Sequence, residues 1–286
     1  MQSRDIQSGE VKITVKKVHV QGRGAIVLTG PSSCGKGEIA KALQNILSIP
    51  NERHLSMGSI LRMTIDRARN DQAFKEKLSA DYGISYRKSI FDLSLNKREH
   101  VLKAEKYKKE LDDYCVKEMI SQLDWLEFCV VKGLLIPDLW TIKLIDAIFE
   151  SSPELQDNIF ILDGYPRTSV AAEKLLGTFL RYQIPLIKVI HLSITKEEMK
   201  KRAFERKRVD DDDESLERRY EFYIEKVHPS VDYMKIRLGS SRVALIDAHQ
   251  PIYDQFDKLD IDKSIQQVAL KVLHELGLPS YLLDLK

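Results

Sequence analysis

The chain has 286 residues, enough for one large α/β domain with insertions or for two smaller domains. Hydrophobic residues make up 43% and charged residues 31%, a balance typical of a folded globular protein. The formal net charge is only +2, so no overall field draws the molecule to nucleic acid or to a membrane surface. Any anion binding must therefore be local.

The chain has three cysteines, Cys34, Cys115 and Cys129, which are too few and too scattered for a disulfide framework. They also lack the paired spacing of a zinc site, so we expect a reducing, cytoplasmic setting. The N-terminus has no apolar signal-peptide core, and no stretch reaches the ~18 apolar residues of a membrane span. We expect neither a leader nor a membrane anchor.

Residues 1–23 begin polar and then alternate, with apolar side chains at Val11, Ile13 and Val15. This alternation predicts an N-terminal arm or an extra edge strand.

The segment 25–47 contains the motif on which most of the interpretation depends. Residues 25–28 are apolar and β-branched, which predicts a short buried strand, and apolar residues at helical spacing over 39–47 predict a helix. Between them, Gly-Pro-Ser-Ser-Cys-Gly-Lys-Gly at 30–37 fits the G-x-x-x-x-G-K pattern of a phosphate-binding loop. Glycines let successive N–H groups face inward, the helix N-terminus adds partial positive charge, and Lys36 brings a full charge to the terminal phosphates. An ordinary turn with a lysine is the alternative, but the flanking strand and helix supply the context that the motif requires.

Gly37 occupies the position where most phosphate-loop proteins carry Ser or Thr, whose hydroxyl reaches Mg²⁺. In this chain a metal ion would be held through water and phosphate oxygens instead.

Residues 54–62 predict a short strand that turns into a helix containing Arg62, and residues 66–131 are dense in charge and predicted helical. Basic and acidic residues interleave over 97–113, which favours a solvated helix face over an anion-binding patch. A repeat of three or four predicts one apolar helix face formed by Leu111, Cys115, Met119, Leu123 and Leu126.

The second half of the chain alternates strands and helices. After a turn over 132–138, Pro137 ends one element and Asp138 is expected to cap a helix. The apolar run 159–162 predicts a buried parallel strand that delivers Asp-Gly-Tyr-Pro-Arg, residues 163–167, at its carboxyl end, where open α/β sheets bind ligands. A helix over 172–179 and a strand over 187–194 follow, and then Thr195 and Glu198 predict a capping box.

The next helix leads into an arginine-rich stretch that surrounds four consecutive aspartates at 210–213. Guanidinium forks bind phosphoryl oxygens bidentately, and phosphoryl transfer needs several such clamps. The arginines are Arg202, Arg206, Arg208, Arg218 and Arg219. Residues 243–246 supply a fifth strand, and residues 265–273 predict a helical tail packed on the sheet.

Five short strands alternating with helices predict a parallel sheet with helices on both faces. The motifs, in their order along the chain, resemble those of the adenylate kinase family. Residues 30–37 resemble its phosphate loop, and residues 55–62 resemble its acceptor segment. Residues 133–138 resemble its Gly-x-Leu-Val-Pro-Asp turn, and residues 163–167 match its Asp-Gly-(Phe/Tyr)-Pro-Arg signature. The resemblance implies a P-loop α/β fold with a five-stranded sheet in the order 2-3-1-4-5. It covers a kinase core at 24–255, with an acceptor-binding subdomain and helical insertion at 56–140 and a short lid at 205–214; residues 256–286 form the tail.

The resemblance also implies roles for individual residues. The donor ATP would bind Ser33, Cys34, Gly35, Lys36, Gly37, Glu38, Arg202, Arg206 and Gln250. The acceptor would bind Met57, Arg62, Gly164, Arg167, Ala171, Arg208 and Arg219. The catalytic set would be Lys36, Arg167, Arg206, Arg208 and Arg219, with Asp163 reaching Mg²⁺ through water.

The departures from the family pattern gather on the acceptor side. Ala171 replaces the glutamine that usually bonds the acceptor adenine, a contact worth about 0.5–1.5 kcal/mol. Met57 and Ser59 replace a threonine and an aspartate, the spacing from Arg62 to the 133–138 turn is longer than usual, and the lid is short and lacks cysteines. Glu38 also places a carboxylate in the first turn of the loop helix, where it suits the helix dipole but could repel a triphosphate.

These residues predict ATP-dependent phosphoryl transfer to a nucleoside monophosphate other than AMP, with Mg²⁺ and by a monomer that binds neither nucleic acid nor membrane. The segment 79–131 could serve a protein partner. Two alternatives stay open: a regulatory or scaffold protein that binds ATP without transferring phosphate, and an ATPase or a kinase for a non-nucleotide acceptor.

Overall fold

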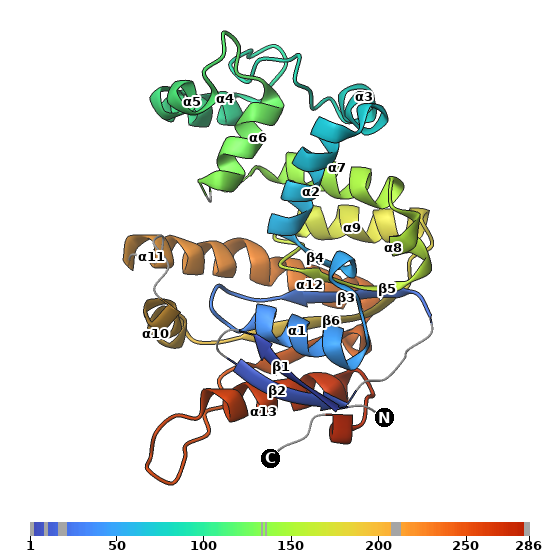
Figure 1. Ribbon diagram of the computed structural model, residues 1–286, viewed down its shortest axis with the longest axis vertical. Helices are drawn as coiled ribbons and strands as arrows, with labels where there is room; N and C mark the ends of the chain where they lie inside the picture. The colour runs from blue at the N-terminus through green and yellow to red at the C-terminus, as the bar shows by residue number, and fades with distance from the viewer. Residues whose placement is uncertain are drawn as a thin grey trace. The chain divides into compact units, whose positions relative to one another are not determined.

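The computed structural model describes residues 3–8, 11–16, 22–132, 134, 136–206 and 213–282 (Figure 1). The chain divides into two compact units. Unit 1 comprises residues 1–56 and 154–286, and unit 2 comprises residues 57–153.

Unit 1 is built on a five-stranded parallel sheet with the strand order β4-β5-β3-β6-β7. The strands are β3 (Gly24–Thr29), β4 (His54–Ser56), β5 (Ile159–Asp163), β6 (Leu186–Ser193) and β7 (Val243–Asp247). Counted along the chain, this is the order 2-3-1-4-5, so the predicted α/β fold is confirmed. The central strand β3 is buried along its whole length because helices cover both of its faces, which explains its unbroken apolar run.

One face of the sheet packs on α1 (Lys36–Ile46), α10 (Lys196–Arg206) and α13 (Ile261–Glu275), which share a core with alternate residues of the strands. The other face packs on α9 (Ser169–Arg181), where the rings of Phe160 and Phe179 pack edge to face with their centroids 6.2 Å apart. Alternation along each parallel strand therefore divides its side chains between two helical layers. Beside α9 lies α12 (His228–Leu238), as Figure 1 shows.

A long helical stretch in unit 1 changes pitch in its middle. It starts as α11 (Asp213–Phe222), passes through a π-helical turn, η2 (Tyr223–Val227), and continues as α12. Short helical segments join the other elements: η1 (Asn51–Arg53), α8 (Pro153–Asp157), η3 (Ser240–Arg242) and η4 (Ser280–Leu282).

The alternating N-terminal residues form a hairpin of their own. The strands β1 (Ser3–Ser8) and β2 (Val11–Lys16) pair antiparallel and make a separate two-stranded sheet. Neither is an edge strand of the five-stranded sheet.

Unit 2 is helical, with α2 (Met57–Asn70), α3 (Gln72–Ala80), α4 (Arg98–Lys106), α5 (Lys108–Cys115), α6 (Gln122–Val131) and α7 (Asp138–Glu150). Residues 81–97 form turns and bends with no helix, although the sequence predicts helix throughout 66–131. Across the described residues of both units, no helix is long and apolar enough to cross a membrane.

The continuous apolar face predicted over 111–126 is wrong, because two helices share it. Val116 adopts a left-handed conformation (φ 38°) and ends α5. Ser121 then starts α6 with a capping box closed by Asp124. Met119 lies between the two helices and is 42% exposed, whereas Leu111 and Leu123 are buried on different helices. Local capping has overridden the periodicity.

Two predicted caps also differ. Asp138 is the first residue of α7, whose N-cap is Pro137, so Asp138 favours the helix through its charge in the first turn. Thr195 Oγ1 accepts the N–H of Glu198 as expected, at 3.2 Å. The Glu198 carboxylate, however, binds Arg202 Nε at 2.6 Å, so its charge serves the site described next.

Candidate active site

The glycine-rich loop leaves the carboxyl end of β3 and runs directly into α1. Gly30 has φ 143°, and a Cβ placed there would lie 2.3 Å from the carbonyl oxygen of Leu192, so only glycine fits beside β6. Gly35 is the N-cap of α1 with φ 90°, and no side chain caps the helix. The first N–H groups of α1 therefore remain available to an anion.

Lys36 reaches back over this loop. Its Nζ donates to the carbonyl oxygens of Gly30 at 2.9 Å and Pro31 at 2.6 Å, and it lies 3.5 Å from Cys34 Sγ. The hydroxyls of Thr29 and Ser33 are buried and have no hydrogen-bond partner within the described residues. A loop with a positive charge, free helical N–H groups and two unbonded hydroxyls has the donor set that phosphate oxygens require.

The structure turns the Glu38 carboxylate toward Lys41, with Oε1 at 3.1 Å from Nζ. This pair along α1 offsets the negative charge that could otherwise repel a triphosphate. Gly37 has open space where a Cβ would stand, so no steric conflict requires glycine there.

The 163–167 turn adjoins this loop. In the sheet register Asp163 lies opposite Leu28, and the Gly164 N–H donates to the Leu28 carbonyl at 2.9 Å. Gly164 has φ 74°, which lets the chain reverse, and its carbonyl accepts from Arg167 Nε at 2.9 Å. Asp163 Oδ2 lies 3.5 Å from His54 Nε2 of β4. Two turns that carry phosphate-binding motifs thus meet at one edge of the sheet.

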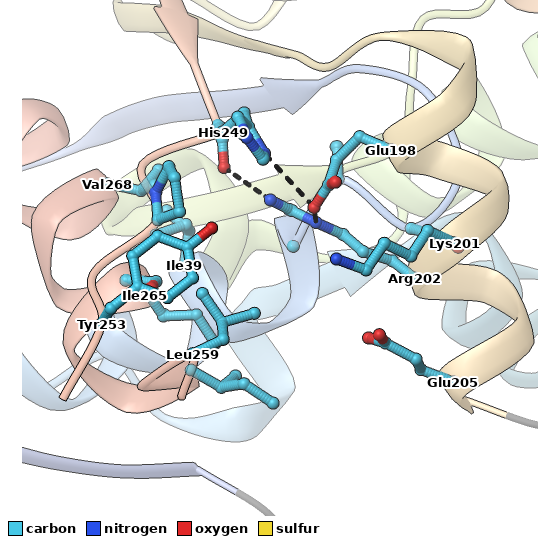
Figure 2. Close-up of a pocket in the computed structure, with 17 residues that line it drawn as sticks. Ile39, Glu198, Lys201, Arg202, Glu205, His249, Tyr253, Leu259, Ile265 and Val268 are labelled. Carbon is cyan, nitrogen blue, oxygen red and sulfur yellow. Dashed lines mark hydrogen bonds and ion pairs between the residues drawn. The ribbon is translucent and has the colours of Figure 1, made fainter. Parts of the chain in front are cut away.

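A pocket opens beside the loop, between α10 and α13 (Figure 2). One wall is apolar, with Tyr253, Leu259 and Ile265 among its residues, and the other wall is the charged face of α10. Such a cleft suits a planar ring system with a polar edge. Its lining residues are Ser33, Cys34, Gly35, Ile39, Glu198, Lys201, Arg202, Glu205, Ala248, His249, Pro251, Tyr253, Leu259, Ile261, Ser264, Ile265 and Val268.

Arg202 is held in this pocket from two sides. Its Nε donates to Glu198 at 2.6 Å and its Nη2 donates to the Ala248 carbonyl at 3.1 Å, while His249 Nδ1 lies 3.3 Å from the same Glu198 oxygen. Burial alone would raise the pKa of the Glu198 carboxyl, but the hydrogen bond and charge of Arg202 outweigh it and hold that pKa below its usual value. The flat guanidinium is therefore fixed in place at the pocket wall.

A buried polar pair lies behind the loop. His191 of β6 is in register with Thr29, and its Nε2 lies 2.9 Å from the hydroxyl of Tyr223 in the π-helical turn. The rings of His191 and Tyr223 are stacked, with their centroids 5.7 Å apart. Burial, followed by the positive charges of His228 and Lys36, lowers the pKa of His191 to about 4. The imidazole is therefore neutral at pH 7 and adds no repulsion to Lys36.

Of the residues predicted from sequence, those from Ser33 to Glu38, together with Asp163, Gly164, Arg167 and Arg202, occupy neighbouring parts of unit 1. Gln250 donates to the Asp247 carbonyl at 3.2 Å and is absent from the pocket lining, where His249 and Pro251 stand instead. Arg219 lies on α11, also in unit 1. Ala171 is fully buried in the first turn of α9, so its methyl group presents no surface to a ligand.

The remaining predicted residues either belong to unit 2 or have their side chains outside the described residues. Met57 and Arg62 belong to α2 in unit 2, where Met57 is 5% exposed and Arg62 is exposed. Arg206 ends α10, but its side chain lies outside the described residues, as does the whole of Arg208 with the lid segment 207–212.

Sequence reasoning missed most of the pocket wall. The sequence predicts only a capping role for Glu198, and Lys201 and Tyr253 carry no motif. Residues 247–251 resemble the family's loop at the donor adenine, but that resemblance points to Gln250, whereas His249 and Pro251 line the pocket. The spacing of Glu198, Lys201, Arg202 and Glu205 at three, four and seven along one helix is the signal that could have found the charged wall.

A family model described as adenylate kinase matches residues 123–238. The adenylate kinase of Cyanothece sp. is 27% identical over 248 residues, which cover 85% of this chain and 94% of that protein. The adenylate kinase of Corynebacterium urealyticum is 24% identical over 80% of this chain and 93% of its own length, and that of Lactobacillus helveticus is 44% identical over 71 residues, 25% of this chain and 32% of that protein. The chain is thus similar to adenylate kinases over most of its length.

Similarity to adenylate kinases agrees with the strand order of the sheet and with the loop geometry of β3 and α1, and it supports a nucleotide kinase function. The family-model match contains β5, Arg167, Arg202 and Arg219. The match to the Cyanothece adenylate kinase spans nearly all of that protein, so the resemblance is not confined to the loop.

Proposed function

We propose that the chain is an ATP-dependent phosphotransferase that converts a nucleoside monophosphate and ATP into a nucleoside diphosphate and ADP. The observation that carries the proposal is the bond from the Gly164 N–H to the Leu28 carbonyl, which joins the 163–167 turn to the phosphate loop. Because of that junction, groups suited to two polyanions stand on neighbouring strands.

The pocket between α10 and α13 would take the donor base, with Arg202 along one side and the apolar wall along the other. The loop N–H groups and Lys36 would hold the β- and γ-phosphates, and Lys36 would exchange its carbonyl partners for phosphate oxygens. Arg62 and Arg167 would anchor the acceptor phosphate, and Arg206, Arg208 and Arg219 would neutralise the transferring group. A phosphate oxygen is already a competent nucleophile, so the site needs no general base, and positioning supplies most of the rate.

Mg²⁺ fits this arrangement through the nucleotide. The described residues contain no group of three or more His, Cys, Asp or Glu side chains that could hold a metal directly. Mg²⁺ is usually bound by one or two carboxylates, water and substrate phosphates, and Asp163 at the end of β5 would supply the carboxylate through water. When bound, the ion would neutralise charge on the phosphates and would be held near the loop by Asp163 through water.

The acceptor is proposed to be a monophosphate other than AMP. Ala171 offers no hydrogen-bonding group, and its burial leaves no room to compensate with water at that point. An acceptor base that needs no hydrogen bond at this position would bind with unchanged free energy, whereas adenine would lose about 0.5–1.5 kcal/mol of binding free energy.

The test is a steady-state assay of ADP formation from ATP with each of the common nucleoside monophosphates. We expect one acceptor to exceed AMP in kcat/KM, and Lys36→Ala to lower transfer about 100-fold or more, as loss of a preorganised charge typically does. Lys271→Ala is the control: it removes an exposed lysine of α13 that does not line the pocket, and it should leave transfer unchanged.

Each other result has a meaning. A clear preference for AMP contradicts the acceptor proposal alone. ATP binding with no transfer to any monophosphate would establish the regulatory alternative, and ATP consumption without an acceptor would establish the ATPase.

A further inference from the structure

Three lysines of unit 2 gather where the chain leaves α3. A Cβ built on Gly83 would lie 3.7 Å from Lys143 Nζ and 3.9 Å from Lys88 Nζ, so both ammonium groups flank the same turn. Gly83 itself has φ 68°, a left-handed conformation that favours glycine. Lys143 comes from α7 and Lys88 from the irregular segment 81–97, and the fold brings them to one point.

The charges of these lysines are not balanced within the described residues. Lys143 Nζ donates to the Tyr82 carbonyl at 2.5 Å, a dipole and not a counter-charge. Burial, followed by the positive charges of Lys88 and Lys97, lowers the pKa of the Lys143 ammonium. No Asp or Glu of the described chain forms an ion pair with any of the three lysines.

Other lysines of the same unit show the contrast. Lys77 pairs with Glu150 at 2.7 Å, Lys117 with Asp124 at 2.6 Å and Lys132 with Glu110 at 2.5 Å. The carboxylates nearest the Gly83 turn in the sequence and its contacts, Asp81 and Glu150, are bound to Lys77, and Glu150 also accepts from the Tyr82 hydroxyl at 2.7 Å. Neither forms an ion pair with the three lysines. Neighbouring positive charges repel one another, and this repulsion destabilises the fold. A bound anion would reduce the repulsion by supplying negative charge between the ammonium groups.

The third lysine, Lys97, is the N-cap of α4, and a ring contact joins α4 to α7. His100 of α4 is 1% exposed and packs on Trp140 of α7, with ring centroids 4.8 Å apart. Lys97 lies one turn before His100, and Lys143 lies one turn after Trp140. Neither nitrogen of the His100 ring has a hydrogen-bond partner within the described residues. Burial, opposed by Glu99 and assisted by Lys97 and Lys103, lowers the pKa of His100, so the ring adds no charge to the cluster at neutral pH.

We propose that Lys88, Lys97 and Lys143, around the Gly83 turn, form a binding site for a small phosphate-bearing anion. Phosphate matches the cluster because it carries up to two negative charges and several strong acceptor oxygens, and ammonium groups bind it as point charges. All the residues belong to unit 2 and none has a place in the proposed transfer reaction. A test of phosphate binding at this site therefore does not depend on whether the proposed transfer reaction is correct.

The experiment is an NMR titration of the isotopically labelled full chain with sodium phosphate, with sodium chloride adjusted to keep ionic strength constant. We expect the amide resonances of Gly83, Lys88 and Lys97 to move and saturate. Phosphate bound at the loop of unit 1 moves a different set, around Gly35 and Lys36, so the two events are read separately. Ribose 5-phosphate and free phosphate form two arms: tighter binding of the ester identifies a phosphate ester as the ligand, and equal binding identifies the free anion.

The double variant Lys88→Gln/Lys97→Gln should weaken binding about tenfold or more, since each ammonium supplies a charge-assisted contact. Lys143 is kept because its bond to Tyr82 supports the end of α3. The control Lys106→Gln/Lys109→Gln removes the same charge from exposed positions of α4 and α5 and should bind phosphate as the parent chain does. Each single Lys→Gln variant at 88 and 97 is also titrated, in case the double variant is less stable.

Two results overturn the proposal. One is the lack of saturable shifts at Gly83, Lys88 and Lys97 in the parent chain. The other is an equal loss of binding in the control pair, which would show that phosphate senses only the overall charge.

Discussion

Single residues of this chain are chosen by backbone geometry as much as by chemistry. Gly30 is required because the carbonyl of Leu192 stands 2.3 Å from where its Cβ would lie, and Gly164 because its φ is 74°. At His191 the surroundings set the chemistry instead: the ring is buried against Tyr223, and this burial keeps the imidazole neutral.

The buried imidazole of His191 should make stability depend on pH. The unfolded chain binds a proton at this ring below a pKa of about 6.5, whereas the folded chain binds it only near 4. Between these values the unfolded state holds more protons, so stability falls as pH falls. We expect urea denaturation to show a loss from pH 7 to pH 4.5, of which about 2 kcal/mol comes from His191.

The variant His191→Gln should lose that part of the decrease, because it has no ring to protonate. His274→Gln, which changes an exposed histidine of α13, should keep the full decrease. An identical pH dependence in the His191→Gln variant and the parent chain would show that His191 does not titrate as its burial requires.

At the scale of elements, helix ends decide what the apolar periodicity leaves open. The residues from 111 to 126 repeat at helical spacing, yet the chain breaks at Val116 and restarts at Ser121. Ser121 Oγ accepts the N–H of Asp124 at 3.1 Å, and Asp124 Oδ2 accepts the N–H of Ser121 at 3.0 Å. This reciprocal cap fixes where α6 begins, and most of that helix is buried, so its register determines which side chains enter the core of unit 2.

Removal of this cap should destabilise the protein. We expect Ser121→Ala to lower the free energy of unfolding by about 1 kcal/mol, since the Asp124 N–H loses its acceptor and the Asp124 carboxylate loses the Ser121 hydroxyl donor. Chemical denaturation measures the change. Ser79→Ala, inside α3, is the control and should be neutral or slightly stabilising, because alanine has the higher helix propensity. Equal stabilities for Ser121→Ala and the parent chain would show that the cap does not hold α6 in place.

At the scale of the whole molecule, the proposed donor site is built from unit 1 alone. The loop, the pocket and the 163–167 turn all belong to residues 1–56 and 154–286, whereas Arg62 and the charged insertion belong to unit 2. Binding of the donor and binding of the acceptor should therefore be separable by mutation.

We expect Arg62→Ala to leave the affinity for ATP unchanged while it lowers kcat/KM for the acceptor about 100-fold, since a phosphate anchor is lost on one side only. Calorimetric titration with ATP and the steady-state assay give the two quantities. Arg69→Ala, on the same helix but paired with Glu127, serves as the control and should affect neither. A loss of ATP affinity in Arg62→Ala as large as in Lys36→Ala would place Arg62 on the donor side instead.

The sequence by itself determined the five-stranded fold and the phosphate loop, because both depend on local features. Apolar runs of strand length, glycines flanking a lysine and an arginine four residues after an aspartate are visible in order along the chain, and parallel topology then brings strand ends to one edge. Only the tertiary structure decided which residues line the donor pocket, since Glu198, Lys201 and Tyr253 carry no motif for this role and meet through packing of α10 and α13. It also decided where unit 2 breaks into α5 and α6, and that Lys88 and Lys143 share one turn, because contacts between distant segments leave no periodic trace in the sequence.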